Sequence, residues 1–174
     1  MKQDDKRAIV IRTMRETDAQ AIHQAFAVQG WDKSLQNLEH YYTDQLEGKR
    51  FIAIAEVDGQ IAGYATLLPF DPHGPFVGKP WPNVNDMNVF IRFRGLGAAS
   101  AMMDRLEAEA AKSSDIITLG VGLHKGYGSA QRLYVKRGYV FDGSGVWYHN
   151  KQLAIGAACR NDDDLVLYMS KKLR

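Results

Sequence analysis

The sequence predicts an α/β fold in which helices and strands alternate around a mixed central sheet. Three observations support this prediction. The run Val84–Ile91 reads as a strand that turns through glycines into a long helical pattern. The run Ile116–Val121 is β-branched and apolar on both faces, as is typical of a central strand. Two further apolar runs flank Asp58-Gly59, which is a strong signal for a two-residue hairpin turn.

The other elements follow from local patterns of the same kind. We expect strands at Ala8–Met14, Phe51–Val57, Gln60–Leu68 and Leu165–Met169. A further strand starts at Tyr139–Phe141, turns at Asp142-Gly143 and continues irregularly at Val146–Tyr148. We expect helices at Leu35–Leu46, Gly95–Lys112 and Ser129–Arg137, and one that Thr17 or Asp18 caps and that runs to Gln29. All 5 prolines lie between Pro69 and Pro82, so this stretch is predicted to be a loop.

Length and composition limit the class of protein. The chain has 174 residues, of which 45% are hydrophobic and 24% charged, so we expect residues 1–174 to form a single globular domain. The net charge of +2 gives no reason to expect a nucleic acid or a membrane as a partner. The first residues lack the apolar core of a signal peptide. The sequence contains no run of about 20 apolar residues, so no membrane span is predicted.

The cysteines and histidines of the chain indicate its redox compartment and whether to expect a metal site. The single cysteine, Cys159, excludes an internal disulfide framework and fits a reducing compartment, so we expect a cytoplasmic protein. The 5 histidines are scattered without the spacing of metal ligands, and no metal site is predicted.

The stretch Asn88–Ser100, NVFIRFRGLGAAS, predicts an anion site. The first turn of a helix leaves backbone N–H groups without partners, and the helix dipole adds roughly half a positive charge there. Gly95 and Gly97 let the backbone approach a phosphate closely, and Arg92 and Arg94 add positive charge. We therefore predict a pyrophosphate site. A Walker loop is excluded, because the sequence has no Gly-Lys-Ser/Thr.

Two signatures identify the pyrophosphate. Read as a dinucleotide fingerprint, the glycines require an acidic residue at the end of the next strand, about 20 residues further on. Asp115 has that spacing but precedes its strand. The pattern R-x-x-G-x-G at Arg92–Gly97 instead resembles the pyrophosphate loop of the GCN5-related N-acetyltransferases (GNAT superfamily), which bind coenzyme A. The segment Ala130–Tyr139, AQRLYVKRGY, resembles the second signature of this family, A-x-x-L-Y-x-K-x-G-F.

This resemblance implies a fold and a cofactor site. The GNAT fold has a mixed sheet of about six to seven strands with about four flanking helices, and its two central parallel strands splay apart. Acetyl-CoA is the implied co-substrate. Val89 and Ile91 are the implied main-chain partners of pantetheine, and an N–H near Val89 or Phe90 would stabilise the oxyanion. The implied pyrophosphate site consists of Arg94, Gly95, Leu96, Gly97 and Ala98, with Arg92 either beside the phosphates or in solvent.

The resemblance also implies direct transfer of an acetyl group to an amine in a ternary complex. Tyr134 holds the position of the family's general acid, although a purely structural tyrosine remains an alternative. The strand Ile116–Val121 carries no carboxylate, so the base stays open between Asp86 and His124. Tyr127 stands where the family often has an asparagine, which puts a local cofactor contact in doubt.

The acceptor is expected to be the amine of a small molecule or a peptide. Trp31, Tyr41 and Tyr42 are either contacts to it or core residues, and the Pro69–Pro82 loop is either a wall of its site or a surface excursion. The alternative to an enzyme is a non-catalytic acyl-CoA sensor or regulatory module. The enzyme is favoured, because binding alone does not require Tyr134 and a chain of this length leaves no room for an attached domain. A homodimer is compatible with this interpretation.

Overall fold

The computed structural model describes residues 8–174 of the chain, which form two compact units. The first unit comprises the described residues up to Leu67 together with Asp86–Leu106. The second comprises Leu68–Asn85 and Glu107–Arg174. Strand β4 (Asn83–Val89) and helix α3 (Ala98–Ala110) both continue from one unit into the other.

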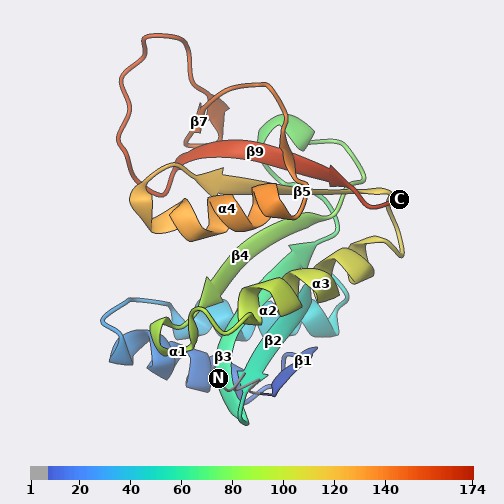
Figure 1. Ribbon diagram of the computed structural model, residues 1–174, viewed down its shortest axis with the longest axis vertical. Coiled ribbons are helices and arrows are strands. Elements are labelled where there is room, and N and C mark those ends of the chain that lie inside the picture. The colour runs from blue at the N-terminus through green and yellow to red at the C-terminus, as the bar shows by residue number, and fades with distance from the viewer. Residues whose placement is uncertain (1–7) are drawn as a thin grey trace, which may run out of the picture. The chain divides into compact units, whose positions relative to one another are not determined.

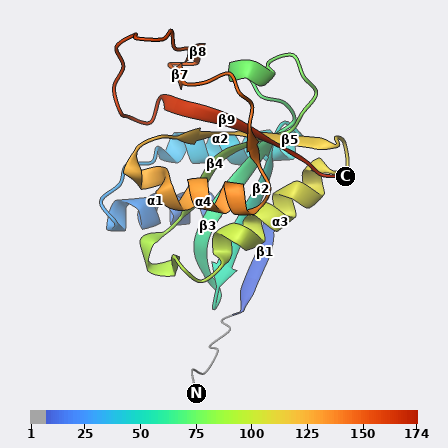
Figure 2. The same ribbon diagram turned by 45° about the horizontal axis from the view of Figure 1, so that its top comes forward.

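The first unit is an antiparallel sheet with helices on both faces. Its elements are β1 (Ile9–Thr13), α1 (Asp18–Val28), α2 (Leu35–Leu46), β2 (Phe51–Val57), β3 (Gln60–Leu68), the later part of β4, the 3-10 turn η2 (Ile91–Phe93) and the start of α3. β1 pairs with β2, and β2 pairs with β3. Helices α1 and α2 lie on one face of these strands and α3 crosses the other (Figure 1, Figure 2).

Burial of β2 explains why this sheet is the centre of the first unit. Residues Ile52 to Ala55 are all fully buried, as expected for a strand that is covered on both faces. Ile22 and Phe26 of α1 and Leu38 of α2 supply the apolar cover from one side. The sheet therefore rests on a continuous apolar core.

The predicted hairpin between β2 and β3 is confirmed. Asp58 and Gly59 have φ angles of 51° and 75°. Two consecutive residues with positive φ are the requirement of a type I′ turn, whose twist matches that of the flanking strands.

The second unit is built around β5 (Ile116–Gly122). The strands of this unit run in the order β4, β5, β9, β7, β8, and β6 also pairs with β9. Its other elements are the 3-10 turns η1 (Gly74–Phe76) and η3 (Lys125–Tyr127), the helix α4 (Gly128–Lys136), and β6 (Val140–Phe141), β7 (Trp147–Tyr148), β8 (Lys151–Gln152) and β9 (Leu165–Lys172). Helix α4 lies alongside β5 (Figure 1, Figure 2).

Pairing around β5 confirms the predicted mixed sheet. β5 pairs antiparallel with β9 along its whole length. Its parallel ladder with β4 covers only Asn83–Val84, at the start of β4, and Thr118–Leu119, in the middle of β5. A short parallel ladder of this kind is what splayed central strands require.

The predicted fold is confirmed, with small differences at element ends. The described residues form nine strands instead of about six or seven. The higher number comes from β6, β7 and β8, which are strands of only two residues each. β4 ends at Val89 instead of Ile91, since Ile91 is already the first residue of η2. Helix α3 begins at Ala98 instead of Gly95, because Gly95 and Gly97 have φ angles of 78° and 94°, outside the right-handed helical region.

The expected cap of α1 differs in detail. Thr17 is the N-cap residue, but its side chain makes no capping hydrogen bond. The Asp18 carboxylate instead accepts a hydrogen bond from the Arg15 N–H at 2.7 Å, and it forms an ion pair with Arg12 at 2.6 Å. Within residues 8–174, no helix combines the length and the apolar character needed to cross a membrane.

We predict opposite stability effects for two glycine-to-alanine variants. In Gly63→Ala, the new Cβ would overlap the Asn88 carbonyl oxygen of β4, so we expect a loss of about 1–3 kcal/mol in the free energy of unfolding. In Gly128→Ala, the residue is helical with φ −56° and has open space, so we expect a gain of roughly 0.4–1 kcal/mol. Urea unfolding of both variants checks this, and a stable Gly63→Ala protein would contradict the close approach of β3 and β4.

Candidate active site

The predicted anion site is a turn of irregular backbone between β4 and α3. Phe90 has extended backbone, and Ile91–Phe93 form the 3-10 turn η2. Gly95 and Gly97 then place the chain in the left-handed region before α3 begins. A Cβ at Gly95 would meet no atom within 4 Å, and one at Gly97 would meet only Ile9 Cδ1 at 3.6 Å. The glycines are therefore needed for backbone conformation and leave open space beside the loop.

The backbone N–H groups of this turn divide into two sets. The Arg94 N–H donates to the Ile91 carbonyl at 3.2 Å, within the loop itself. The next four N–H groups, those of Gly95, Leu96, Gly97 and Ala98, donate to no acceptor among residues 8–174. Four N–H groups at the positive end of a helix dipole form a site for a phosphate group. Of the five N–H groups predicted to hold the pyrophosphate, four are thus available.

Other predicted cofactor contacts are already made within the protein. The Ile91 N–H donates to Gln29 Oε1 of α1 at 3.1 Å, and Arg94 Nε donates to the Val89 carbonyl at 3.3 Å. Both main-chain groups are those that the sequence assigns to pantetheine. A ligand that accepts from the Ile91 N–H must first displace the Gln29 side chain, whereas the Val89 carbonyl, which has two lone pairs, can accept a second hydrogen bond.

Phe90 has a packing role in the first unit. The residue is 97% buried, and its ring meets the Phe26 ring edge to face at 5.4 Å. Its N–H donates to the Ala62 carbonyl of β3 at 2.9 Å, and its carbonyl accepts from the Phe93 N–H at 2.9 Å. Since the Phe90 N–H is used, Val89 remains as the candidate oxyanion donor.

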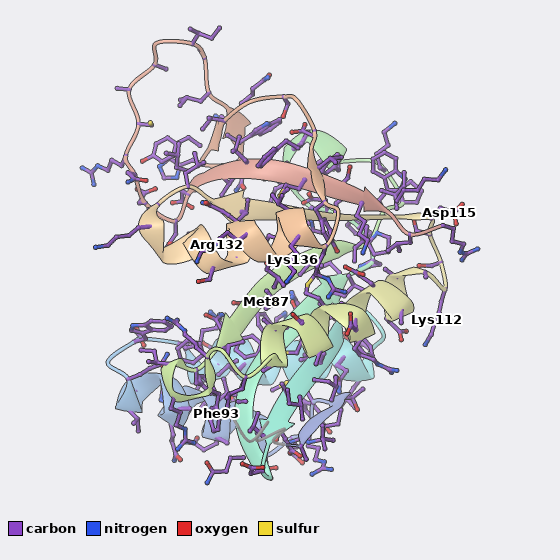
Figure 3. All side chains as sticks on the ribbon, in the orientation of Figure 1. Met87, Phe93, Lys112, Asp115, Arg132 and Lys136 are labelled. Carbon is purple, nitrogen blue, oxygen red and sulfur yellow. The ribbon has the colours of Figure 1, made fainter. Side chains whose placement is uncertain are left out.

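The two arginines of the loop lie over aromatic rings. Phe93, labelled in Figure 3 where the chain leaves β4, is buried and anchors η2. The Arg92 guanidinium lies 4.5 Å from the centre of its ring. The Arg94 guanidinium lies 5.4 Å from the centre of the Trp31 ring. Both arginine side chains are exposed, so they can turn toward an anion without breaking a buried contact.

Asp86, the predicted base candidate, is the centre of a polar cluster in the first unit. Its Oδ2 accepts from Lys33 Nζ at 2.5 Å, from the Tyr41 hydroxyl at 3.0 Å and from the Tyr64 hydroxyl at 2.9 Å. Its Oδ1 accepts from Asn88 Nδ2 at 2.8 Å. A carboxylate with one cation and three neutral donors is held in a fixed position.

The surroundings of Asp86 keep the two tyrosines protonated. Burial raises the pKa of the Tyr64 hydroxyl, and the Asp86 charge and its hydrogen bond raise it further. The same causes, again led by burial, raise the pKa of Tyr41. Both hydroxyls therefore act as donors to the carboxylate at neutral pH.

The backbone at Asp86 is strained. Its φ angle is 54°, a left-handed conformation in the middle of strand β4. Such a conformation costs a non-glycine residue on the order of 1–3 kcal/mol and is often found at functional sites. Asn88, two residues further on, donates a hydrogen bond to the Asp86 carboxylate at 2.8 Å.

The sequence identified only part of this cluster. Asp86 and Tyr41 were predicted as site candidates, whereas Lys33, Tyr64 and Asn88 were not. Tyr64 lies in an apolar strand, where an aromatic residue is normally interpreted as core. The available signal was the polar content of the central strand, NVNDMNV, because a strand at the centre of a sheet is normally apolar.

Tyr134, the predicted general acid, lies in the second unit on α4. It is 94% buried, and burial, with a smaller effect of Tyr127, raises the pKa of its hydroxyl. Its hydroxyl has no hydrogen-bond partner among the described residues. Gln131 Nε2 ties the helix to the end of β5 by donating to the Gly122 carbonyl at 2.8 Å. The arrangement suits a protonated phenol whose proton is not committed to the protein.

His124, the other base candidate, is committed to structural contacts in the second unit. Its Nδ1 accepts from the Gly126 N–H at 3.0 Å, so Nε2 carries the proton and donates to Asp163 Oδ1 at 2.8 Å. The Tyr127 hydroxyl donates to the same Asp163 oxygen at 3.0 Å, and these bonds lower the pKa of Asp163. His124 borders a surface cavity of about 480 Å³ but has no free lone pair, which favours Asp86 as the base.

The proline-rich loop is anchored within the second unit. Asp71 is buried at its start, and Asn83 Nδ2 donates both to Asp71 Oδ2 at 3.2 Å and to Thr118 Oγ1 at 3.1 Å. Phe76 in η1 packs edge to face against Tyr168 of β9 at 6.2 Å. The loop therefore has a fixed conformation, as a wall of a binding site requires.

Comparisons with known proteins identify the family. The model of the acetyltransferase (GNAT) family matches residues 16–139. The chain therefore belongs to this family, as its two signatures predict. It is an acetyltransferase, an enzyme that takes its acyl group from acetyl-CoA. No protein with a curated function matches the chain significantly.

Solved structures support the fold. An N-acetyltransferase from Staphylococcus aureus is 19% identical, with a TM-score of 0.70 over 96% of this chain and 99% of its own. The ribosomal-protein-alanine N-acetyltransferase from Brucella melitensis is 21% identical, with a TM-score of 0.69 over 94% and 99%. The protein yncA from Salmonella typhimurium, solved with its cofactor acetyl-CoA, is 20% identical, with a TM-score of 0.68 over 96% and 95%. At these identities the likeness concerns the fold.

We predict that Gly97→Asp weakens coenzyme A binding at least tenfold, or about 1.4 kcal/mol, because a carboxylate would repel the phosphates from the α3 N-terminus. Gly48→Asp is the matched control, since Gly48 also has a positive φ of 71° and open space around it. Calorimetry with coenzyme A checks both variants. Undiminished affinity in Gly97→Asp would contradict the assignment of this loop to the pyrophosphate.

Proposed function

We propose that the protein transfers the acetyl group of acetyl-CoA to an amine nitrogen, by direct attack of the amine in a ternary complex. The amine belongs to a small molecule or a peptide. The observation that carries this proposal is the cluster at Asp86, where a carboxylate already holds an ammonium group, that of Lys33, at 2.5 Å. A site with this negative charge suits an amine better than a hydroxyl or a thiol acceptor.

Acetyl-CoA supplies an activated acetyl group with a thiol leaving group. The N–H groups of Gly95, Leu96, Gly97 and Ala98 hold its pyrophosphate, because they have no other acceptor in the described chain. Arg92 and Arg94 add charge beside it. The Val89 carbonyl binds the pantetheine arm through its second lone pair, and the Ile91 N–H binds it once Gln29 has moved away.

Asp86 orients the amine and helps to deprotonate it. An alkylammonium ion with a pKa near 10.4 reacts only as the neutral amine, which costs about 4.6 kcal/mol at pH 7. A carboxylate that accepts the ammonium N–H directly, or through one water, offers a path for this proton. Tyr41, Tyr64 and Asn88 keep the carboxylate in place while the proton moves.

Tyr134 protonates the departing thiolate. Burial raises the pKa of its hydroxyl, so the phenol stays protonated through the physiological range and serves as an acid and not as a base. A thiol of the cysteine type has a pKa of about 8.5, so its thiolate is already a fair leaving group. The contribution of the acid therefore lies toward the lower part of the usual range of about 10² to 10⁴.

An acceptor screen tests the proposed function. Release of free thiol from acetyl-CoA is followed in the presence of alkylamines, polyamines, amino acids and peptides with free N-termini, with alcohols and thiols of matched size as controls. We expect thiol release with at least one amine and none above background with the matched alcohol. Release with an alcohol or thiol alone would contradict N-acetylation while leaving the family assignment intact.

We predict that Tyr134→Phe lowers turnover by roughly 10²-fold with little change in the affinity for acetyl-CoA. The ring and its packing against Tyr139, at 5.8 Å between ring centres, remain in this variant. Melting temperature and turnover are measured on the same preparation, with the acceptor that the screen identifies. Full turnover in Tyr134→Phe would show that the tyrosine is structural.

A further inference from the structure

Lys33 lies in an aromatic cage in the first unit. It belongs to the irregular segment Trp31–Ser34 that joins α1 to α2. Its ammonium group is 2.5 Å from Asp86 Oδ2 and lies 5.6 Å and 5.8 Å from the ring centres of Tyr41 and Tyr64. A carboxylate with two tyrosine rings at these distances can bind an organic cation. The Arg50 guanidinium also lies over the Tyr41 ring, 4.2 Å from its centre.

The cage does not depend on Lys33 for its shape. Tyr41, Tyr64 and Asn88 each donate a hydrogen bond to Asp86. These three bonds remain if the lysine leaves. Asn88 Nδ2 also lies 3.3 Å from the Tyr64 hydroxyl, which links the donors to one another. The walls of the site are therefore preorganised for another cation.

Only the side chain of Lys33 needs to move for the cage to open. Its backbone carbonyl accepts a hydrogen bond from His23 Nδ1 of α1 at 2.6 Å. The next residue, Ser34, is the N-cap of α2 and accepts from the Asn37 N–H at 3.3 Å. The Lys33 side chain is 20% exposed, so it can swing into solvent by rotation about its own bonds.

We propose that Lys33 is an internal stand-in for the acceptor, and that its ammonium occupies the subsite of a primary amine on an unbranched alkyl chain. This inference rests on the proposed function, since it makes the Asp86 cage the amine subsite of that reaction. A free acceptor binds only when Lys33 has left. If the lysine fills the cage 90–99% of the time, the apparent affinity for the acceptor is reduced on the order of 10- to 100-fold.

The test uses Lys33→Ala and n-butylamine, which is the lysine side chain without its backbone. In Lys33→Ala we expect the KM for n-butylamine acetylation, followed by thiol release, to fall at least tenfold relative to the parent protein. Without acetyl-CoA, n-butylammonium should raise the melting temperature of Lys33→Ala and not that of the parent, because a ligand of the native state stabilises it. Lys33→Ser is a second small variant in case alanine impairs folding.

Matched controls isolate the cage. Lys49→Ala removes a lysine that is 66% exposed and pairs with Glu47, and it should leave both readouts at their parent values. 1-Butanol, which has the same chain without the charge, should not stabilise Lys33→Ala. Asp86→Asn in the Lys33→Ala background should abolish stabilisation by n-butylammonium.

The outcomes separate this inference from the proposed function. If Lys33→Ala shows no gain in n-butylamine affinity by either readout, the stand-in role is wrong. If n-butylammonium binds the opened cage but is not acetylated, while another amine is turned over by the parent protein, the cage is not the acceptor subsite. If no amine gives thiol release with the parent protein, the proposed function fails, and the melting shift still reports on the cage.

Discussion

The carboxylate of Asp86 is the interaction on which the candidate site depends. A half-buried carboxylate is costly unless cations or hydrogen-bond donors compensate it. Here a lysine from the α1–α2 connection, a tyrosine from α2, a tyrosine from β3 and an asparagine from β4 all converge on one side chain. The left-handed backbone of Asp86 is maintained because these four contacts over-determine it. The same contacts connect the elements of the first unit and build a cation site.

The loop before α3 shows the opposite arrangement, in which donors lack acceptors. Gly95 and Gly97 prevent the loop from continuing the helix backward, so the N–H groups from Gly95 to Ala98 find no carbonyl partner among the described residues. Before this loop, the Ile91 N–H donates to the Gln29 side chain, and the Val89 carbonyl accepts from the Arg94 side chain. The N–H groups that can bind a phosphate are therefore free within the described chain, whereas the main-chain groups at the end of β4 are hydrogen-bonded to side chains. Binding of the pyrophosphate can precede that of the pantetheine arm, because only the arm has to displace a side chain, that of Gln29.

The fold was predictable from the sequence because its signals are local. The turn at Asp58-Gly59, the β-branched run of β5 and the glycines before α3 each specify a backbone conformation within a few residues. The short strand β8 was not predicted, because Lys151-Gln152 has no pattern and is defined only by its pairing with Trp147-Tyr148.

The candidate site was predictable only where it lies in a motif. The loop Arg92–Gly97 carries its chemistry in consecutive residues. The cage does not, since Lys33 and Asp86 are 53 positions apart, and Tyr64 and Asp86 are 22 apart. No pattern in a single sequence indicates that Lys33, in a connecting segment, and Tyr64, in an apolar strand, both donate to the Asp86 carboxylate. Phe90 has a packing role that its place in the motif does not indicate, because its ring contacts Phe26 and its N–H donates to the Ala62 carbonyl.

The charge of the cage also explains why an internal cation would be retained. With neither an acceptor nor Lys33 in place, the Asp86 carboxylate, whose side chain is 18% exposed, would keep only neutral hydrogen-bond donors. Lys33 supplies a cationic donor to this carboxylate from the same chain, and the hydrogen bond from His23 to its carbonyl keeps it close. An acceptor amine then replaces one ammonium by another, so the net charge of the site does not change on binding. The selectivity of such an exchange comes from the length and shape of the alkyl chain between Tyr41 and Tyr64, and much less from the charge itself.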